Sequence, residues 1–349
     1  MKIAVFGASG YTGRLVVAEL RRRGLGAVTV GRDAGRLRAA AAEAGLADRN
    51  VRVAEAGDAA ALAAAFRDCD AVVNCAGPFT RWGEPVVAAA LAAGVPYVDT
   101  AGEQPYLKRV FDAFGAAAER AGVPVVPAVT DDGVPSDLLA HLTAARVGEA
   151  EEVTIALELT GGGLTRGSIR SLGGIAGELR DGGLGYVDGA WTPRAAARRK
   201  EFVMAQGSGP VPVRRTALPA VVTAPRHVRT RHLETVTTEE VYGLLASLPP
   251  EPADGVPEGP DPRVRAEAGW SFAVEATGRD GRRARGEVRG RDTYRTTALV
   301  AVEGAYRLVT RGAPAGVLAP AQAFDAVSFL DFLAGHGAVW SVADLPGGV

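Results

Sequence analysis

Three residues are candidates for proton transfer: Tyr97, Asp99 and Asp131. A carboxyl group or a phenol held near a reacting atom can donate or accept a proton. Tyr97 and Asp99 are two residues apart in the segment Tyr97–Glu103 (YVDTAGE), so a strand would point both side chains to the same face. Asp131 begins an Asp-Asp pair further along the chain. A structural role stays open for each of them, and Glu103 is also suited to capping a helix.

Two other kinds of chemistry lack the residues they need. Cys69 and Cys75 are six residues apart and give no disulfide framework, and no pattern of His, Cys and Asp has metal-ligand spacing. We therefore expect no metal. A Tyr-x-x-x-Lys pair is excluded as well, because none of the seven tyrosines is followed by lysine four residues later.

A glycine-rich turn, GASGYTG, separates the first predicted strand from the first predicted helix. Gly7 lets the chain turn off the strand, Gly10 lets the backbone approach a pyrophosphate, and Gly13 lets the helix pack close to the sheet. The start of the helix adds free N–H groups and a partial positive charge. The turn thus predicts a dinucleotide site, and the residues expected to form it are Gly7, Ser9, Gly10, Tyr11, Thr12 and Gly13.

The end of the second predicted strand indicates which dinucleotide binds. A carboxylate near this point is typical of NAD sites. Here Gly31 leaves space, and Arg32 can pair with a 2′-phosphate, assisted by Arg36 one turn later. Asp33, a carboxylate near this point, favours NADH instead. We expect NADPH (NADP) as the cofactor, with Asp58 placed either for the adenine amino group or for capping its own helix.

The fourth predicted strand, Ala71–Asn74, runs into the small residues of NCAGPF. A loop at the carboxyl end of a central strand passes beside a bound dinucleotide. We expect this loop to lie next to the nicotinamide ribose, through Asn74, Cys75, Ala76, Gly77 and Pro78.

The elements that must position these residues change in kind along the chain. Short apolar strands alternate with helices over about the first 130 residues, as in a parallel sheet covered on both faces. Later, the predicted strands Trp270–Ala276 and Arg283–Arg289 are joined by a tight Gly-Arg-Asp-Gly turn, which indicates a hairpin. The predicted fold is α/β: an N-terminal Rossmann-type parallel sheet domain with a second α+β domain built on an antiparallel sheet.

The predicted boundaries follow from this change. Residues 1–130 form the NADP-binding domain, residues 131–312 form the domain that binds substrate, and a C-terminal helical segment, 313–349, returns to the first domain. Within the second domain, Pro249–Pro262 (PPEPADGVPEGPDP) is predicted to be a mobile loop from its composition.

The composition limits the partners. A net charge of -1 and an aromatic content of 6% give no reason to expect a nucleic-acid partner. No apolar run is long enough to span a bilayer, and the first residues do not resemble a signal peptide. We expect a cytoplasmic protein, and an exposed antiparallel sheet would suit a homodimer.

Several segments in order resemble the saccharopine dehydrogenase-like oxidoreductases. They are GASGYTG, GRD, NCAGPF, RWGEPVV and YVDTAGE, with weaker likeness at TDDGVPSD and PAGVLAPA. The nearest branch looks like the short members, which include trans-acting enoyl reductases. The resemblance implies an NAD(P)H-dependent oxidoreductase whose second domain shapes the substrate pocket.

Three functions are therefore considered. The leading one is an NADPH-dependent reductase that transfers a hydride to a conjugated C=C bond of a small or carrier-bound metabolite. The first alternative is saccharopine-type reduction or oxidation at C=N, in which Tyr97 or Asp99 would orient the imine nitrogen. The second, from another class, is a non-catalytic NADP-binding redox sensor.

Overall fold

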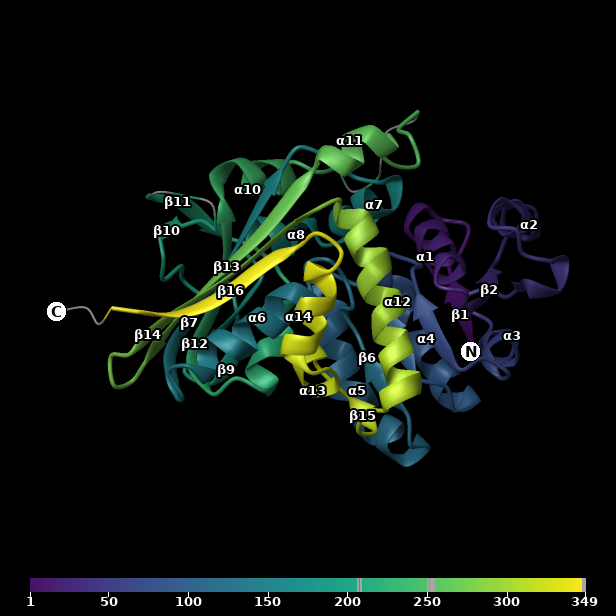
Figure 1. The fold of residues 1–349 in the computed structure, drawn as a ribbon, viewed down its shortest axis with the longest axis horizontal. Helices are drawn as coiled ribbons and strands as arrows, with labels where there is room; N and C mark the ends of the chain where they lie inside the picture. Colours follow the sequence, from purple (N-terminus) through teal and green to yellow (C-terminus); the bar gives the residue numbers. More distant parts are fainter. Residues whose placement is uncertain (206, 208, 250, 252–254, 347–349) are drawn as a thin grey trace.

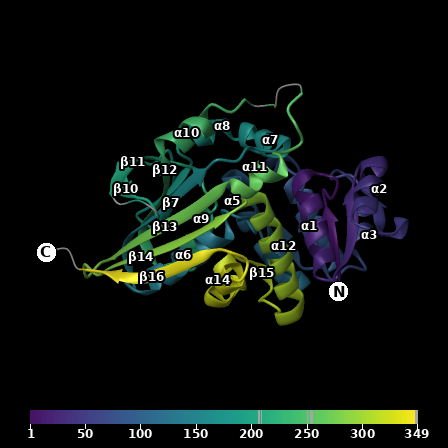
Figure 2. The ribbon, with the colours of Figure 1, turned by 45° about the horizontal axis from the view of Figure 1, so that its top comes forward.

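A computed structural model describes residues 1–205, 207, 209–249, 251 and 255–346, which contain two β-sheets (Figure 1). The sheet formed mainly by the N-terminal part of the chain lies at one end of the molecule, and the second sheet lies at the other. The long helix α12 (Thr293–Arg311) stands between them in both views (Figures 1 and 2). Most buried apolar residues of the two sheets form one continuous core, and a smaller separate cluster lies within the second sheet.

The first sheet has seven strands in the order β15-β6-β5-β4-β1-β2-β3, and all of its strand pairs are parallel. The central strands β1 and β4 are almost entirely buried, as a parallel sheet with helices on both faces requires. This confirms the predicted Rossmann-type sheet. The strands are β1 Lys2–Phe6, β2 Gly26–Gly31, β3 Val51–Val53, β4 Ala71–Asn74, β5 Tyr97–Asp99, β6 Pro124–Val126 and β15 Gly316–Val317.

The helices of this sheet lie on opposite faces because the strand order reverses between β1 and β4 and the crossovers are right-handed. Helices α3, α4 and α5 pack side by side, and α1 packs against α12 on the other side. Helix α12 also lies on β4 and β5. The bounds are α1 Tyr11–Arg22, α2 Ala34–Glu43, α3 Ala59–Phe66, α4 Phe79–Ala93 and α5 Gln104–Ala121, with a single 3-10 turn at Asp48–Asn50.

The second sheet has nine strands, seven of them in the order β10-β11-β12-β7-β13-β14-β16. The hairpin β8-β9 is attached through the pairing of β8 with β12. The sheet was expected to be antiparallel, but β12 runs parallel to β7, which makes it a mixed sheet. The strands are β7 Ala150–Thr160, β8 Leu184–Val187, β9 Ala190–Pro193, β10 Glu201–Val203, β11 Pro210–Arg215, β12 Thr230–Thr238, β13 Gly269–Gly278, β14 Arg283–Arg291 and β16 Val339–Leu345.

The parallel pair has a topological cause. Between β7 and β12 the chain makes a long excursion through several helices and the β8-β9 hairpin, and it returns in the same direction. The hairpin expected between β13 and β14 is confirmed, and Gly281 in its turn has a φ of +82°. The remaining helices are α6 Val134–Ala145, α7 Arg166–Gly174, α8 Ala176–Arg180, α9 Ala220–Thr223, α10 Glu239–Ala246, α11 Pro262–Glu267, α13 Pro320–Ala323 and α14 Ala326–Ala334, with a 3-10 turn at Ala224–Arg226.

The C-terminal part of the chain is shared between the sheets. Helix α12, expected in the second domain, covers the first sheet. Within the expected segment 313–349, β15 extends the first sheet beside β6, whereas β16 pairs with β14 in the second sheet. The periodicity of a helix indicates that one face is buried, but not which sheet buries it. In the described part of the chain, no helix combines the length and the apolar character that a membrane crossing needs.

The close approach of α1 to the turn before it gives a first prediction, for Gly13→Ala. A β-carbon at Gly13 would lie 2.2 Å from the carbonyl oxygen of Gly7 and 2.8 Å from the α-carbon of Ala8. Because the overlap is with backbone, we expect the free energy of unfolding to fall by about 1–3 kcal/mol. Urea unfolding measures it.

Gly115→Ala, inside α5, is the matched control. A β-carbon at Gly115 meets no heavy atom within 4 Å, so this variant should be neutral or stabilised by up to about 1 kcal/mol. Equal stability of Gly13→Ala and the wild type would contradict the close packing of α1.

Candidate functional site

The glycine-rich turn forms a cradle of backbone N–H groups at the carboxyl end of β1. Gly7 adopts a φ of +80°, where a side chain would be strained. Gly10 is the N-cap of α1, and no side chain in the described part of the chain caps this end. The N–H groups of Tyr11, Thr12 and Gly13 therefore remain for an anion, together with the positive end of the helix dipole. This geometry suits a pyrophosphate.

The loop after β4 lies directly beside this turn. A β-carbon on Gly7 would be 3.0 Å from the β-carbon of Ala76. Asn74 is fully buried, and its Oδ1 accepts the N–H of Ala76 at 2.9 Å while its Nδ2 donates to the Tyr97 hydroxyl at 2.9 Å. Asn74 thus shapes the loop from below. Dinucleotides bind at the point where the strand order of such sheets reverses, which here is between β1 and β4.

The rest of the loop after β4 is open to a ligand. Gly77 is exposed and Pro78 is half-buried, at the start of α4. The thiol of Cys75 is no nucleophile, because burial raises its pKa to about 12.

The side chains expected at the adenosine end have separate environments. Arg32 follows β2 and is exposed, and it makes no ion pair or hydrogen bond with the described residues. The Asp33 carboxylate accepts the N–H of Arg36 at 2.9 Å and so caps α2. Because Asp33 caps a helix, its presence is weaker evidence against NADPH. Asp58 caps α3 by accepting the N–H of Ala61 at 2.9 Å.

Tyr97 and Asp99 lie in the interior, with no exposed surface. The Asp99 carboxylate accepts four hydrogen bonds: from the hydroxyls of Tyr106 at 2.7 Å and Tyr97 at 3.0 Å, and from the N–H groups of Ala128 at 2.9 Å and Ala101 at 3.1 Å. Burial raises the pKa of Asp99 to about 6, although these hydrogen bonds act in the opposite direction. A fully buried carboxylate with this many partners holds the surrounding loops in place.

Glu103 is a second buried carboxylate with a positioning task. It is 1% exposed and accepts the N–H groups of Phe79 and Thr80, both at 2.7 Å. Glu103 therefore satisfies the start of α4, and not that of its own helix α5. It fixes the end of the loop that follows β4.

Asp131 and Asp132 form a half-buried carboxyl pair after β6. The Thr297 hydroxyl on α12 donates to Asp131 Oδ1 at 2.6 Å, and Thr130 donates to Asp132. Burial and the negative charge of Asp132 raise the pKa of Asp131 to about 7, and burial also raises that of Asp132. The pair faces the loop after β5, since a β-carbon on Gly102 would be 3.5 Å from Asp132 Oδ2. A carboxyl group in this state can hold a proton near neutral pH.

Three residues near this pair or near the loop after β4 were not found from the sequence: Thr297, Tyr294 and Ser171. The Tyr294 hydroxyl accepts the N–H of Thr165 at 2.8 Å and lies 3.1 Å from the Ser168 hydroxyl, so it holds the start of α7. Ser171 on α7 approaches the loop after β4: a β-carbon on Gly77 would lie 2.4 Å from its Oγ. Sequence patterns did not indicate Thr297 or Tyr294 as site residues, because nothing in the sequence places α12 against β4 and β5.

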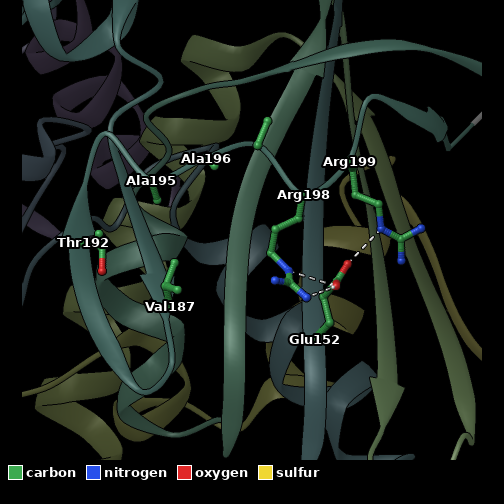
Figure 3. Close-up of a pocket in the computed structure, with 8 residues that line it drawn as sticks. Glu152, Val187, Thr192, Ala195, Ala196, Arg198 and Arg199 are labelled. Carbon is green, nitrogen blue, oxygen red and sulfur yellow. Dashed lines mark hydrogen bonds and ion pairs between the residues drawn. The ribbon is translucent and has the colours of Figure 1, made fainter.

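A cavity of about 730 Å³ opens elsewhere, in the second domain (Figure 3). It is lined by Val187 and Thr192 of the β8-β9 hairpin, by the following loop, and by Glu152 of β7. Arg198 and Arg199 point toward Glu152 from either side, at 3.0 and 2.9 Å. Both guanidinium groups are paired, and no residue at the ends of the parallel strands contributes to the lining.

The Asp99 network gives a prediction for Asp99→Asn. An amide offers one acceptor oxygen to four donors, so we expect the free energy of unfolding to fall by about 2–4 kcal/mol at pH 7. The folded-state pKa, about 6, lies above the usual 3.8. The folded wild type therefore binds more protons than the unfolded chain, and its stability falls as the pH rises from about 4 to about 6.

Urea unfolding across this pH range measures both effects. Asp99→Asn lacks the titration and should not show that decline. The control, Asp112→Asn, removes an exposed carboxylate that pairs with Lys108 on α5 and should change stability by less than about 0.5 kcal/mol. A fully stable Asp99→Asn would argue against the positioning role.

Known proteins are similar to the N-terminal part of this chain. Residues 3–126 match the family described as saccharopine dehydrogenase NADP binding domain. A trans-acting enoyl reductase of Mycobacterium ulcerans is 33% identical over 152 residues, which cover 42% of this chain and 36% of that protein. A lipid droplet localized protein of Caenorhabditis elegans is 32% identical over 146 residues, covering 39% of this chain and 34% of that protein. The matched part spans less than half the length of these relatives.

Solved structures show the same fold over the whole chain. Saccharopine dehydrogenase (L-Glu forming) from Saccharomyces cerevisiae aligns with a TM-score of 0.66 at 14% identity, covering 99% of this chain and 100% of that one. An amine dehydrogenase from Mycobacterium smegmatis aligns with a TM-score of 0.51 at 14% identity, covering 93% and 96%. The solved structures thus share the fold of this chain, and residues 3–126 are similar in sequence to the NADP-binding domain of saccharopine dehydrogenases.

Proposed function

We propose that this chain is an NADPH-dependent reductase that acts on a conjugated C=C bond of a small or carrier-bound metabolite. The observation that carries the proposal is the Asp131–Asp132 pair, a proton-holding group at the same edge of the sheet as the dinucleotide cradle. The carboxyl ends of β1, β4, β5 and β6 all face this edge, because the strands are parallel. A cofactor on the β1 and β4 loops would leave its substrate in reach of the loops after β5 and β6.

The cofactor supplies a hydride when it is bound, and reduction of C=C also needs one proton at the other carbon. The N–H groups at the start of α1 and the side chain of Arg32 would hold its phosphates. Asn74 and Glu103 keep the loop after β4 in place beside it. Asp131 would hold the proton, with Thr297 orienting its carboxyl group. Tyr97 and Asp99 were the other candidates for proton transfer. In this proposal they position the loops around the site.

The likeness to enoyl reductases supports C=C over C=N as the bond reduced. A strongly basic pocket for a carboxylate in the second domain would favour a saccharopine-type C=N reaction, but both arginines of the 730 Å³ cavity are paired with Glu152. A non-catalytic sensor would need no proton-holding pair beside its dinucleotide site. The cytoplasm as the compartment and a homodimer as the assembly remain predictions.

The cofactor assignment predicts a specific effect of Arg32→Ala. Loss of charge-assisted hydrogen bonds to a 2′-phosphate should weaken NADPH binding about 10- to 100-fold, while NADH binding should change by less than about twofold. Titration of the protein with each dinucleotide, followed by nicotinamide fluorescence, measures both affinities. The control is Arg38→Ala. Arg38 lies on the same helix as Arg36, is exposed, and pairs with Asp48. Equal losses for the two dinucleotides would remove Arg32 from the 2′-phosphate site.

The proton-donor assignment predicts a pH dependence. Reduction needs protonated Asp131, so kcat should fall as the pH rises through about 7. Asp131→Asn should lower kcat about 100- to 10,000-fold without changing the Kd for NADPH. The measurement is NADPH oxidation with a panel of 2-enoyl thioesters across pH 5–9, in roughly one-unit steps.

Asp132→Asn serves as the companion variant. It removes the negative charge that helps to raise the pKa of Asp131, so the falling limb of the profile should move to lower pH while activity is retained. A fully active Asp131→Asn with an unchanged profile would refute the assignment.

A further inference from the structure

A segment of the second domain, residues 255–261, lies against the glycine-rich turn. The Tyr11 hydroxyl donates to the carbonyl oxygen of Pro260 at 2.9 Å, and a β-carbon on Gly259 would lie 2.3 Å from the Tyr11 ring. The Arg166 N–H on α7 donates to the Glu258 carbonyl oxygen at 3.1 Å. The segment belongs to the predicted loop Pro249–Pro262, of which residues 250 and 252–254 lie outside the described part. Helix α11, which follows this segment, lies at the start of α1, where Arg265 donates to the Tyr11 hydroxyl at 3.2 Å (Figure 2).

The Glu258 side chain reaches the adenosine end of the cofactor site. Its carboxylate pairs with Arg36 on α2, and its second oxygen lies 3.7 Å from Arg14 Nη2 on α1. The same Arg36 Nη2 donates to the carbonyl oxygen of Ser9 at 3.3 Å. An anionic group from the second domain therefore sits between two guanidinium groups, beside the turn that holds the pyrophosphate.

A 2′-phosphate on the adenosine ribose would need the same surroundings. It carries up to two negative charges, and it lies at the end of β2, close to the turn between β1 and α1. Arg36, which was expected to assist Arg32 there, is already engaged by Glu258. Two anions cannot share one guanidinium group at close range without repulsion, since like charges a few ångströms apart oppose each other.

We infer that Glu258 competes with the 2′-phosphate of NADPH for Arg36 and thereby sets how strongly the site prefers NADPH over NADH. The inference rests on the proposed NADPH site. With NADH, the Glu258–Arg36 pair is retained. With NADPH, the pair separates and Arg36 turns to the phosphate.

The competition is limited in size. The side chains of Arg36 and Glu258 are 52% and 39% exposed, and exposed ion pairs contribute little to stability. We therefore expect Glu258→Gln to tighten NADPH binding by roughly three- to tenfold, because the amide keeps the shape of the side chain but lacks the negative charge that attracts Arg36 and repels the phosphate.

The test measures the Kd values of NADPH, NADH, adenosine 2′,5′-bisphosphate and 5′-AMP with the full chain. The matched control is Glu251→Gln, which removes the same charge from the same loop, where Glu251 pairs with Arg170 at 3.3 Å. Tighter binding of NADPH and of the bisphosphate in Glu258→Gln alone, with NADH and 5′-AMP unchanged, supports the inference.

Other outcomes overturn it. Equal tightening of NADPH and NADH would mean that Glu258 acts on the site as a whole and not on the 2′-phosphate. Suppose that the wild type binds NADPH and that Glu258→Gln binds it equally well or more weakly. This result would overturn the inference but leave the proposed function intact. If neither the wild type nor the variants bind either dinucleotide, the proposed function fails together with the inference.

Discussion

One buried carboxylate, that of Asp99, holds the loops at the ends of three neighbouring strands. It accepts the N–H of Ala101 after β5 and the N–H of Ala128 after β6, and through Tyr97 and Asn74 it is linked to the loop after β4. Each of these loops leaves the sheet at the edge where the cofactor and substrate are expected to meet. Because hydrogen bonds to a buried charge are strong and directional, this one group sets the relative positions of the loops.

The carboxyl groups near the site fall into two kinds, and their partners distinguish them. Asp99 and Glu103 are buried, and each accepts backbone N–H groups, which keeps the chain in place. Asp131 and Asp132 are half-buried, lie next to each other, and have their pKa values raised. Two adjacent carboxylates in a poorly hydrated place favour keeping a proton between them. The first kind suits structure, and the second kind suits proton transfer.

The second domain takes part in the site through contacts that bridge the two sheets. Tyr11 at the start of α1 lies edge-on to Tyr294 of α12, with ring centroids 5.3 Å apart, and bonds to the segment that carries Glu258. Helix α12 in turn brings Thr297 to Asp131. Contacts of Tyr11, Tyr294 and Thr297 thus connect the glycine-rich turn, the carboxyl pair and the segment 255–261.

The sequence by itself determined the Rossmann sheet, the glycine-rich turn at Gly7–Gly13 and the likeness to NADP-binding domains, because these depend on local patterns: glycine where the backbone needs it, and apolar strands alternating with helices. It also predicted the β13-β14 hairpin. It did not show that Tyr97 and Asp99 would be fully buried while Asp131 stays half-buried. Only the tertiary structure decided that α12 crosses to the first sheet, that β12 pairs parallel to β7, and that Glu258 meets Arg36. Those contacts join residues eighty or more positions apart, and the burial that governs their chemistry exists only after the chain has packed.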